Sequence, residues 1–226
     1  MNWDSIRLVV FDVDGTLYDQ KSLRLRMLTD LVSHTLASRS LTTLRVLRAY
    51  RQLREKIGDE EVQDFDDILL DRTSQKARID KAKIAALVHE WMERRPLAHI
   101  GACLCPHIED LFVALKRRDK LIGVFSDYPA EDKLRAMGLK ADFIVSATDA
   151  GVGILKPNPR GLEVIMAAAC VGPQETIMIG DRADRDGEAA RRAGVAALIR
   201  SGKPLVGWSS FSDYAAPQFS SLFVAE

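Results

Sequence analysis

The chain has 226 residues, of which 47% are hydrophobic and 28% are charged, as is usual for a globular protein of one or two domains. Its 32 basic and 32 acidic residues cancel, which argues against nucleic acid or a membrane surface as a partner attracted by overall charge. No apolar run approaches the ~18 residues that a membrane span needs, and the first residues show no export signal. We therefore expect a cytoplasmic protein.

The three cysteines are Cys103, Cys105 and Cys170, an odd number without the spacing of a disulfide framework. Cys103, Cys105 and His107 lie close enough in the sequence to suggest a metal site. However, structural zinc sites usually combine two such clusters, and the sequence has no second one. We expect free thiols that pack as small hydrophobic side chains.

Five short apolar runs predict β-strands. Helical patterns that begin with acidic residues or proline and end near glycine follow three of these runs. The strands are expected at residues 7–12, 121–126, 143–146, 176–180 and 195–199, and the helices at residues 130–137, 161–170 and 188–193. Strands that alternate with helices pair in parallel through right-handed crossovers. Such sheets carry their sites beyond the carboxyl ends of the strands.

One long segment, residues 18–99, breaks this alternation. Apolar residues such as Leu25 and Leu28 recur there at helical spacing, and no run predicts a strand. We expect an all-helical insert of residues 18–99 within a core made of residues 1–17 and 100–226.

Two acidic residues follow the first predicted strand directly. Successive side chains of an extended chain point to opposite sides, so Asp12 and Asp14 can share one side while Val13 points away. Gly15 then permits a tight turn. Two carboxylates this close repel each other, which a shared proton or a bound cation relieves. Oxygen ligands of this kind suit Mg²⁺.

Polar residues also follow the other predicted strands. Ser126 ends the second strand, Lys156 precedes a proline-rich turn, and Asp181 ends the fourth strand. Each is ordinary alone, because a serine there is usually a helix cap and an aspartate there usually lies in a solvated loop. Together they place two acidic clusters, a lysine and a serine at one edge of the sheet, which predicts a catalytic site.

The set of motifs resembles that of the haloacid dehalogenase superfamily. Its four ordered motifs match Asp12-Val-Asp-Gly-Thr, Ser126, Lys156-Pro-Asn-Pro and Gly180-Asp-Arg-Ala-Asp-Arg-Asp186. The helical insert between the first and second motifs resembles the cap of the phosphoglycolate-phosphatase-like branch. From this resemblance we expect an α/β fold with a three-layer Rossmann-like core. Its mostly parallel sheet should have about five strands in the order 5-4-1-2-3, and an all-α cap should be inserted into the core.

The resemblance implies a Mg²⁺-dependent phosphohydrolase that acts through an aspartyl-phosphate. Asp12 would be the nucleophile, and Asp14 would protonate the leaving alcohol and then deprotonate the attacking water. The family's Mg²⁺ is held by the nucleophile, the backbone carbonyl of Asp14 and the acid at Asp181, and it offsets the repulsion between carboxylate and phosphate.

The phosphate site is implied in the same way. The hydroxyl of Ser126 and backbone N–H groups such as that of Asp127 would hold phosphate oxygens, and Lys156 would pair with the nucleophile and the phosphoryl group. Many relatives have Asn where this chain has Asp127, so we expect that its carboxylate points away from the phosphate or caps a turn. Asp186 is the first choice for the second acid of the fourth motif, and Asp184 is the alternative.

The first part of the insert is strongly basic. Between Lys21 and Lys56 only Asp30 and Glu55 are acidic. The segment is either a basic lid that attracts an anionic substrate or a set of solvated helix faces, and the latter is the commoner explanation. Lys21 and Arg24 are the best candidates for substrate contacts, because they lie one helical turn from the expected hinge.

Other activities remain as alternatives. A dehalogenase is disfavoured by Asp14, and a sugar-phosphate mutase by Arg24, where those relatives have His. A phosphonate hydrolase would need a cap lysine, for which Lys21 is available. A phospho-receiver regulatory domain lacks a long cap, and a catalytically silent interaction protein would not keep every catalytic group. We expect a small phosphorylated metabolite as the partner, neither nucleic acid nor membrane, and leave monomer or homodimer open.

Overall fold

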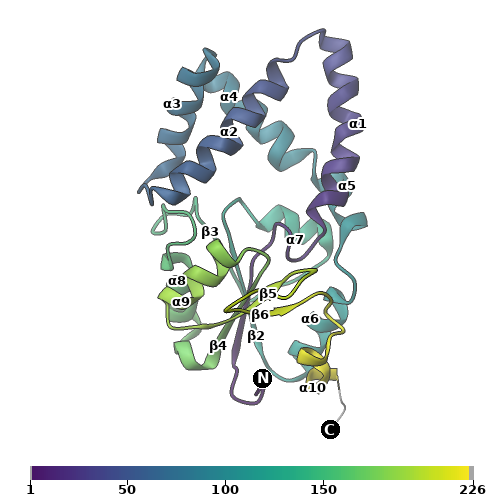
Figure 1. The fold of residues 1–226 in the computed structure, drawn as a ribbon, viewed down its shortest axis with the longest axis vertical. Helices are drawn as coiled ribbons and strands as arrows, with labels where there is room; N and C mark the ends of the chain where they lie inside the picture. Colours follow the sequence, from purple (N-terminus) through teal and green to yellow (C-terminus); the bar gives the residue numbers. More distant parts are fainter. Residues whose placement is uncertain (1, 224–226) are drawn as a thin grey trace.

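The computed structural model describes residues 2–223 and shows two lobes, a sheet flanked by helices and a group of helices above the carboxyl ends of its strands (Figure 1). Residue 1 and residues 224–226, which we assigned to the core, lie outside the described part. The strands are β1 (Leu8–Phe11), β2 (Leu121–Ser126), β3 (Phe143–Ser146), β4 (Thr176–Gly180), β5 (Ala196–Arg200) and β6 (Ser209–Phe211).

The sheet has six strands in the order β3-β2-β1-β4-β5-β6, and every neighbouring pair is parallel. This confirms the predicted parallel sheet and the order of its first five strands. The additional strand, β6, pairs with β5 at one edge. It was missed because it has only three residues, Ser-Ser-Phe, which give no apolar run.

Helices cover both faces of the sheet and make it a three-layer structure (Figure 1). The helical segments of this lobe are α5 (Leu97–Ile100), η2 (Gly101–Cys103), α6 (Ile108–Arg117), α7 (Glu131–Met137), α8 (Arg160–Ala169), η3 (Pro173–Glu175), η4 (Ala183–Gly187), α9 (Glu188–Arg192), η5 (Pro217–Phe219) and α10 (Ser220–Phe223). All four residues of β1 are buried, as expected for the central strand of a parallel sheet.

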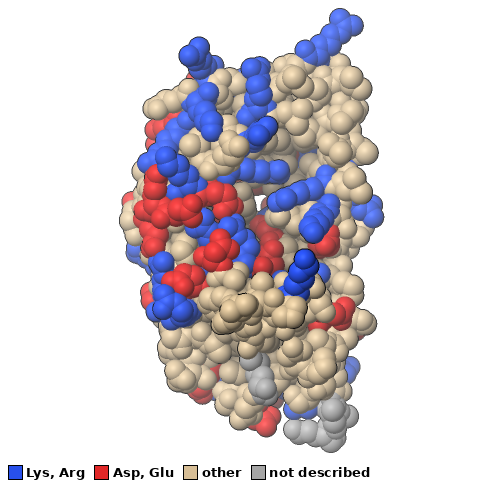
Figure 2. Space-filling model, in the orientation of Figure 1, with Lys and Arg blue, Asp and Glu red and all other residues tan. Residues whose placement is uncertain are grey.

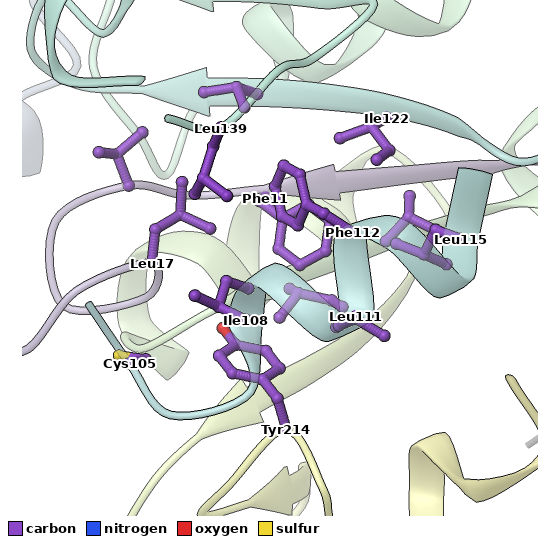
Figure 3. Close-up of a cluster of buried hydrophobic side chains, with 14 of the residues drawn as sticks. Phe11, Leu17, Cys105, Ile108, Leu111, Phe112, Leu115, Ile122, Leu139 and Tyr214 are labelled. Atoms are coloured by element: carbon purple, nitrogen blue, oxygen red, sulfur yellow. The ribbon is translucent and has the colours of Figure 1, made fainter. Parts of the chain in front are cut away.

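Alternate residues of β1 build two separate cores. Val9 and Phe11 belong to the cluster formed with α6 and the C-terminal segment, and Figure 3 shows Phe11 packed beside Phe112, with 4.9 Å between ring centroids. Leu8 and Val10 point to the opposite face and pack with α8. The period of two along the strand therefore fixes both layers.

The upper lobe consists of helices, as predicted. Its elements are α1 (Gln20–Ser38), α2 (Thr42–Asp59), α3 (Phe65–Ala77), α4 (Lys81–Val88) and the π-helical turn η1 (His89–Arg94). A third hydrophobic cluster, which includes Tyr50, Ile57 and Phe65, joins α2, α3 and α4. Leu155 and Ala147 of the lower lobe pack against this cluster, so the two lobes share apolar contacts.

The two chain crossings between the lobes lie side by side. Tyr18 and Leu104 form an antiparallel bridge, and the Asp19 N–H donates to the carbonyl of Cys103 over 2.8 Å. Cys103 and Cys105 are buried free thiols, and Cys170 is exposed. Within residues 2–223, no helix combines the length and the apolar character needed to cross a membrane.

Candidate active site

The turn after β1 holds the first acidic pair. Asp12 is only 5% exposed, and its backbone N–H donates to the carbonyl of Ile179 in β4, 2.8 Å away. The Thr16 hydroxyl donates to Asp12 Oδ2 over 2.9 Å. Gly15 adopts a φ of 100°, a left-handed conformation that favours glycine. The turn thus fixes one carboxylate oxygen of Asp12 and leaves the other for a different partner.

That partner is Lys156, whose ammonium lies between two buried carboxylates. Lys156 Nζ donates to Asp12 Oδ1 and to Asp186 Oδ1, each over 2.6 Å, and to the Phe125 carbonyl over 3.3 Å. Burial alone would lower the pKa of Lys156, but Asp12 and Asp186 outweigh it and raise this pKa well above its usual value. The lysine therefore remains a cation beside the carboxylate of Asp12.

Of the two candidate acids in the loop after β4, Asp186 is the one that contacts Lys156. Its Oδ2 also accepts bonds from the N–H groups of Asp181 and Arg182, over 3.2 and 3.0 Å. A side chain at Gly180 would collide with Asp186, since a Cβ there would lie 2.3 Å from Asp186 Cβ. Asp184 is exposed and pairs with Arg182 over 2.8 Å.

Three carboxylates gather at this edge of the sheet. Oxygen atoms of Asp12, Asp181 and Asp186 lie within 4.8 Å of one another. Burial, followed by the charge of Asp186, raises the pKa of Asp181 to about 7. Burial also raises the pKa of Asp12 well above its usual range, against the lowering effect of Lys156.

This charge pattern fits a divalent cation. One lysine does not compensate the crowded carboxylates, and oxygen donors are the ligands that Mg²⁺ prefers. Gly15 leaves room for the acid from β4, because a Cβ at that position would lie 2.1 Å from Asp181 Oδ2. Asp186 is already bonded to Lys156 and to two N–H groups, which leaves Asp12 and Asp181 as the freer side-chain donors.

Asp14 has a partner that the sequence analysis missed. Lys133 Nζ of α7 donates to both carboxylate oxygens of Asp14, over 2.6 and 2.8 Å, and the Tyr18 hydroxyl donates to the same carboxylate. Burial raises the pKa of Asp14, but Lys133 and Tyr18 outweigh it and lower this pKa below its usual value. Lys133 shares a helical face with Ala130, Leu134 and Met137, so its place in an apolar stripe was the available signal.

Ser126 and Asp127 end β2 beside this cluster. Ser126 is fully buried, and its hydroxyl accepts a bond from the Tyr128 N–H over 3.2 Å. The Asp127 carboxylate accepts a bond from the Lys156 N–H over 3.0 Å, so it caps the neighbouring turn. Asp127 and Tyr128, rather than Ser126, line the adjoining cavity.

A second missed residue is Arg54 of α2, which reaches the site from the helical lobe. Its guanidinium donates to the Asp127 carbonyl and, over 3.2 Å, to the Tyr50 hydroxyl. It lies 4.0 Å from the ring centroid of Tyr128 and 5.0 Å from that of Phe65. Arg54 is 5% exposed, its Nε has no hydrogen-bond partner, and within residues 2–223 no carboxylate forms an ion pair with it.

The C-terminal part of the core supports the acidic turn. The Tyr214 hydroxyl donates to the carbonyl of Thr16, and Arg200 Nη1 donates to the carbonyl of Gly15, both over 3.0 Å. Tyr214 is fully buried. No element was predicted after residue 199, yet Arg200 and Tyr214 hold the backbone of the turn that carries Asp12 and Asp14.

A cavity of about 650 Å³ opens above these residues, between the two lobes. Asp12, Asp14, Lys156, Asp181 and Asp186 all line it. Figure 2 shows lysine and arginine side chains gathered around the hollow between the lobes. Of the two candidates for substrate contacts, Arg24 of α1 lines the cavity, whereas Lys21 is exposed and is not part of its wall.

The chain is similar to known hydrolases and phosphatases. Residues 6–194 match the profile of the haloacid dehalogenase-like hydrolases. A glyceraldehyde 3-phosphate phosphatase of Methanopyrus kandleri is 28% identical over 207 residues, which cover 88% of this chain and 85% of the relative. A phosphoglycolate phosphatase of Vibrio vulnificus is 25% identical over 209 residues, with the same two coverages.

The fold is similar to that of solved structures. A HAD-type hydrolase of Bacillus subtilis, solved bound to magnesium, superposes with a TM-score of 0.70 at 18% identity, over 97% of this chain and 99% of that one. The profile match spans all four motifs, from Asp12 to Asp186. The chain therefore belongs to the haloacid dehalogenase-like hydrolase family.

Proposed function

We propose that the protein is a Mg²⁺-dependent phosphatase that hydrolyses a small phosphomonoester through an aspartyl-phosphate on Asp12. The observation that carries the proposal is the placement of Lys156 Nζ, 2.6 Å from both Asp12 and Asp186, at the base of a cavity that opens to substrate. Two relatives named as phosphatases support the reaction class.

In the proposed first step, a carboxylate oxygen of Asp12 attacks phosphorus. The bond between phosphorus and the ester oxygen breaks, an acyl phosphate forms on Asp12, and Asp14 gives its proton to the departing alkoxide. Lys156 holds the Asp12 carboxylate in place and compensates charge on the phosphoryl oxygens.

In the second step, Asp14 takes a proton from a water molecule that attacks phosphorus. The bond between phosphorus and Asp12 breaks, inorganic phosphate leaves, and both carboxyl groups return to their first states. Asp14 thus acts as acid and then as base, for which its partners Lys133 and Tyr18 keep it fixed.

The Asp12 and Asp181 carboxylates and the Asp14 carbonyl would hold Mg²⁺, which offsets the repulsion between the nucleophile and the phosphate. The Asp127 N–H and Lys156, both on the cavity wall, would bind phosphate oxygens. The Ser126 hydroxyl lies behind that wall and would hold the loop in place through the bond that it accepts from the Tyr128 N–H. Asp186 acts through Lys156 and is a positioning residue. Asp184, which is exposed and paired with Arg182, has no role in this proposal.

Residues 18–99 would act as a cap that closes over a core of residues 1–17 and 100–226. The paired crossings at Tyr18 and Leu104 are suited to a hinge, and closure would exclude water during attack. The phosphonate hydrolase alternative required Lys21 at the site, and Lys21 lies outside the cavity wall, so that reaction is not favoured.

The test is hydrolysis of a panel of phosphorylated metabolites with Mg²⁺ and with EDTA. We expect turnover that needs Mg²⁺ and that falls below about 1% of wild type in Asp12→Asn, because an amide is a poor nucleophile. Asp132→Asn changes an exposed acid of α7 and is the matched control. Unchanged hydrolysis in EDTA or in Asp12→Asn would contradict the proposal.

A further inference from the structure

The cavity above the catalytic residues is much larger than a two-carbon phosphate ester requires. Its volume is about 650 Å³, and its upper walls are formed by α1 and α2. On α2 the lining runs from Gly58 back to Leu44, and on α1 from Gln20 to Leu31. At ~1.5 Å per residue, the α2 wall is about 21 Å long and the α1 wall about 16 Å long.

The part of the walls near the catalytic end is cationic. Arg24 on α1 and Arg51 and Arg48 on α2 line the cavity. Along the helix axis Arg51 lies about 4.5 Å and Arg48 about 9 Å before Arg54, which contacts the Asp127 carbonyl. Arg24 donates to Gln20, and within the described chain none of the three arginines pairs with a carboxylate.

Carboxylates also line this end of the cavity, but Asp12 and Asp186 are already paired with Lys156, and Asp14 is paired with Lys133. Glu55 is the acidic neighbour on α2, and it is already paired with Arg182 over 2.8 Å and with Arg185 over 3.3 Å. Arg54 is a further cation without a carboxylate partner. Hence the helical lobe offers guanidinium groups beyond the phosphate site that are available to a second anion.

Farther from the catalytic end the walls become apolar. Met27 and Leu31 of α1 face the cavity, as do Leu44 and Leu47 of α2. Leu44 is 38% exposed although it lines a cavity, so this part of the wall has apolar surface left to bury. An apolar segment of substrate would remove that surface from water.

We propose that the substrate is an amphiphilic phosphomonoester with a second anionic group near the phosphoryl group and an apolar segment beyond it. The proposal rests on the proposed phosphatase function and specifies the substrate class of the same site. The phosphoryl group binds at Asp12 and Lys156, the second anion binds between Arg24 and Arg51, with Arg48 next to them, and the apolar segment lies between Leu31 and Leu44.

The test compares four phosphomonoesters that combine the two features. Ethyl phosphate has neither feature, phosphoglycolate has a second anionic group, n-octyl phosphate has an apolar chain, and 2-(phosphonooxy)octanoate has both. Each ester is used below its critical micelle concentration. We expect kcat/KM to be highest for 2-(phosphonooxy)octanoate. It should exceed the value for phosphoglycolate by about tenfold or more, and the value for n-octyl phosphate by a similar factor.

Variants assign each preference to its residues. Arg51→Gln should remove most of the advantage that the carboxylate gives and leave the advantage of the chain. Leu31→Gln should remove most of the advantage that the apolar chain gives and leave the advantage of the carboxylate. The controls are Arg45→Gln on α2 and Leu25→Gln on α1, which alter exposed residues of the same helices outside the cavity wall and should change neither preference.

Two outcomes would overturn the inference by different routes. If phosphoglycolate is hydrolysed as well as 2-(phosphonooxy)octanoate, or if Arg51→Gln and Leu31→Gln leave the preferences intact, the substrate class is wrong and the phosphatase function stands. If none of the four esters is hydrolysed but another phosphorylated metabolite is, the substrate class is again wrong. If no phosphomonoester is hydrolysed with Mg²⁺, the phosphatase function itself is wrong. Binding of the same compounds to Asp12→Asn, measured by calorimetry, should follow the same order as kcat/KM.

Discussion

Lys133 and Asp14 form a buried ion pair that joins α7 to the turn after β1, with Lys133 Nζ 2.6 and 2.8 Å from the two carboxylate oxygens. The side chain of Lys133 is 5% exposed and that of Asp14 is 16% exposed. This pair favours the ionised form of the group that we propose as the general acid and base. It therefore sets the pH at which that group can donate a proton.

Removing this cation should shift the pH dependence of the first step. Lys133 lowers the pKa of Asp14, so Lys133→Met should raise that pKa. An acid with a higher pKa stays protonated to higher pH, so the alkaline limb of kcat/KM for ethyl phosphate should move to higher pH.

The leaving group provides the control for this prediction. With p-nitrophenyl phosphate, whose leaving group needs little protonation, the limb should move much less. Movement of the limb to lower pH, or the same movement with both esters, would show that Lys133 acts on another group.

The two acids after β4 should differ in their effect on catalysis. Asp186→Asn removes a carboxylate that bonds to Lys156, and we expect kcat to fall about 10- to 100-fold, as for other residues that orient a catalytic group. Asp184→Asn alters an exposed acid and should leave kcat within about twofold of wild type. Steady-state kinetics of both variants decide between them, and a larger loss in Asp184→Asn would reverse the assignment.

Arg54 should matter for anion binding more than for stability. A buried guanidinium without a carboxylate partner contributes little to folding, whereas a charge-assisted bond to an anion is worth about 2 kcal/mol or more. Arg54→Met should weaken inhibition by inorganic phosphate about 30-fold and change Tm little. Arg45→Met on the same helix is the control. A large fall in Tm with unchanged inhibition would make Arg54 a structural residue.

Gly15 should be required for the acid at Asp181 to reach its position. Gly15→Ala places a Cβ 2.1 Å from Asp181 Oδ2 and imposes a φ of 100° on alanine, so Asp181 must move. We expect the Mg²⁺ concentration for half-maximal activity to rise about tenfold or more. Gly202→Ala should leave this concentration unchanged, because no atom beyond the adjacent residues lies within 4 Å of the new Cβ. If Gly15→Ala and Gly202→Ala need the same Mg²⁺ concentration for half-maximal activity, Asp181 does not contribute to metal binding.

The sequence was informative where local pattern determines structure. The buried strands before Asp12 and Asp181 are continuous apolar runs, and parallel pairing brings their ends together, so the sequence alone predicts the acidic cluster. Helical spacing likewise indicated the upper lobe, because its apolar residues recur every three to four positions.

The remaining site residues depend on tertiary contacts that no local pattern specifies. Lys133 and Arg54 occupy positions in apolar helical stripes, and their partners lie 119 and 73 residues away. Tyr214 reaches the turn at Thr16 from 198 residues away. Whether such a residue supports a site or merely covers a core is decided by how the lobes pack, which periodicity does not encode.

Trapping the phosphorylated enzyme would test directly whether Asp12 is the nucleophile. Wild-type protein would be mixed with Mg²⁺ and a phosphomonoester that it hydrolyses, and quenched in acid during a single turnover. The quenched protein would then be reduced with borohydride and digested for mass spectrometry. Borohydride reduces an acyl phosphate on Asp12 to homoserine, so we expect homoserine at position 12, and none when substrate is omitted. Turnover that leaves Asp12 unlabelled, or labels another carboxylate, would contradict the proposed chemistry.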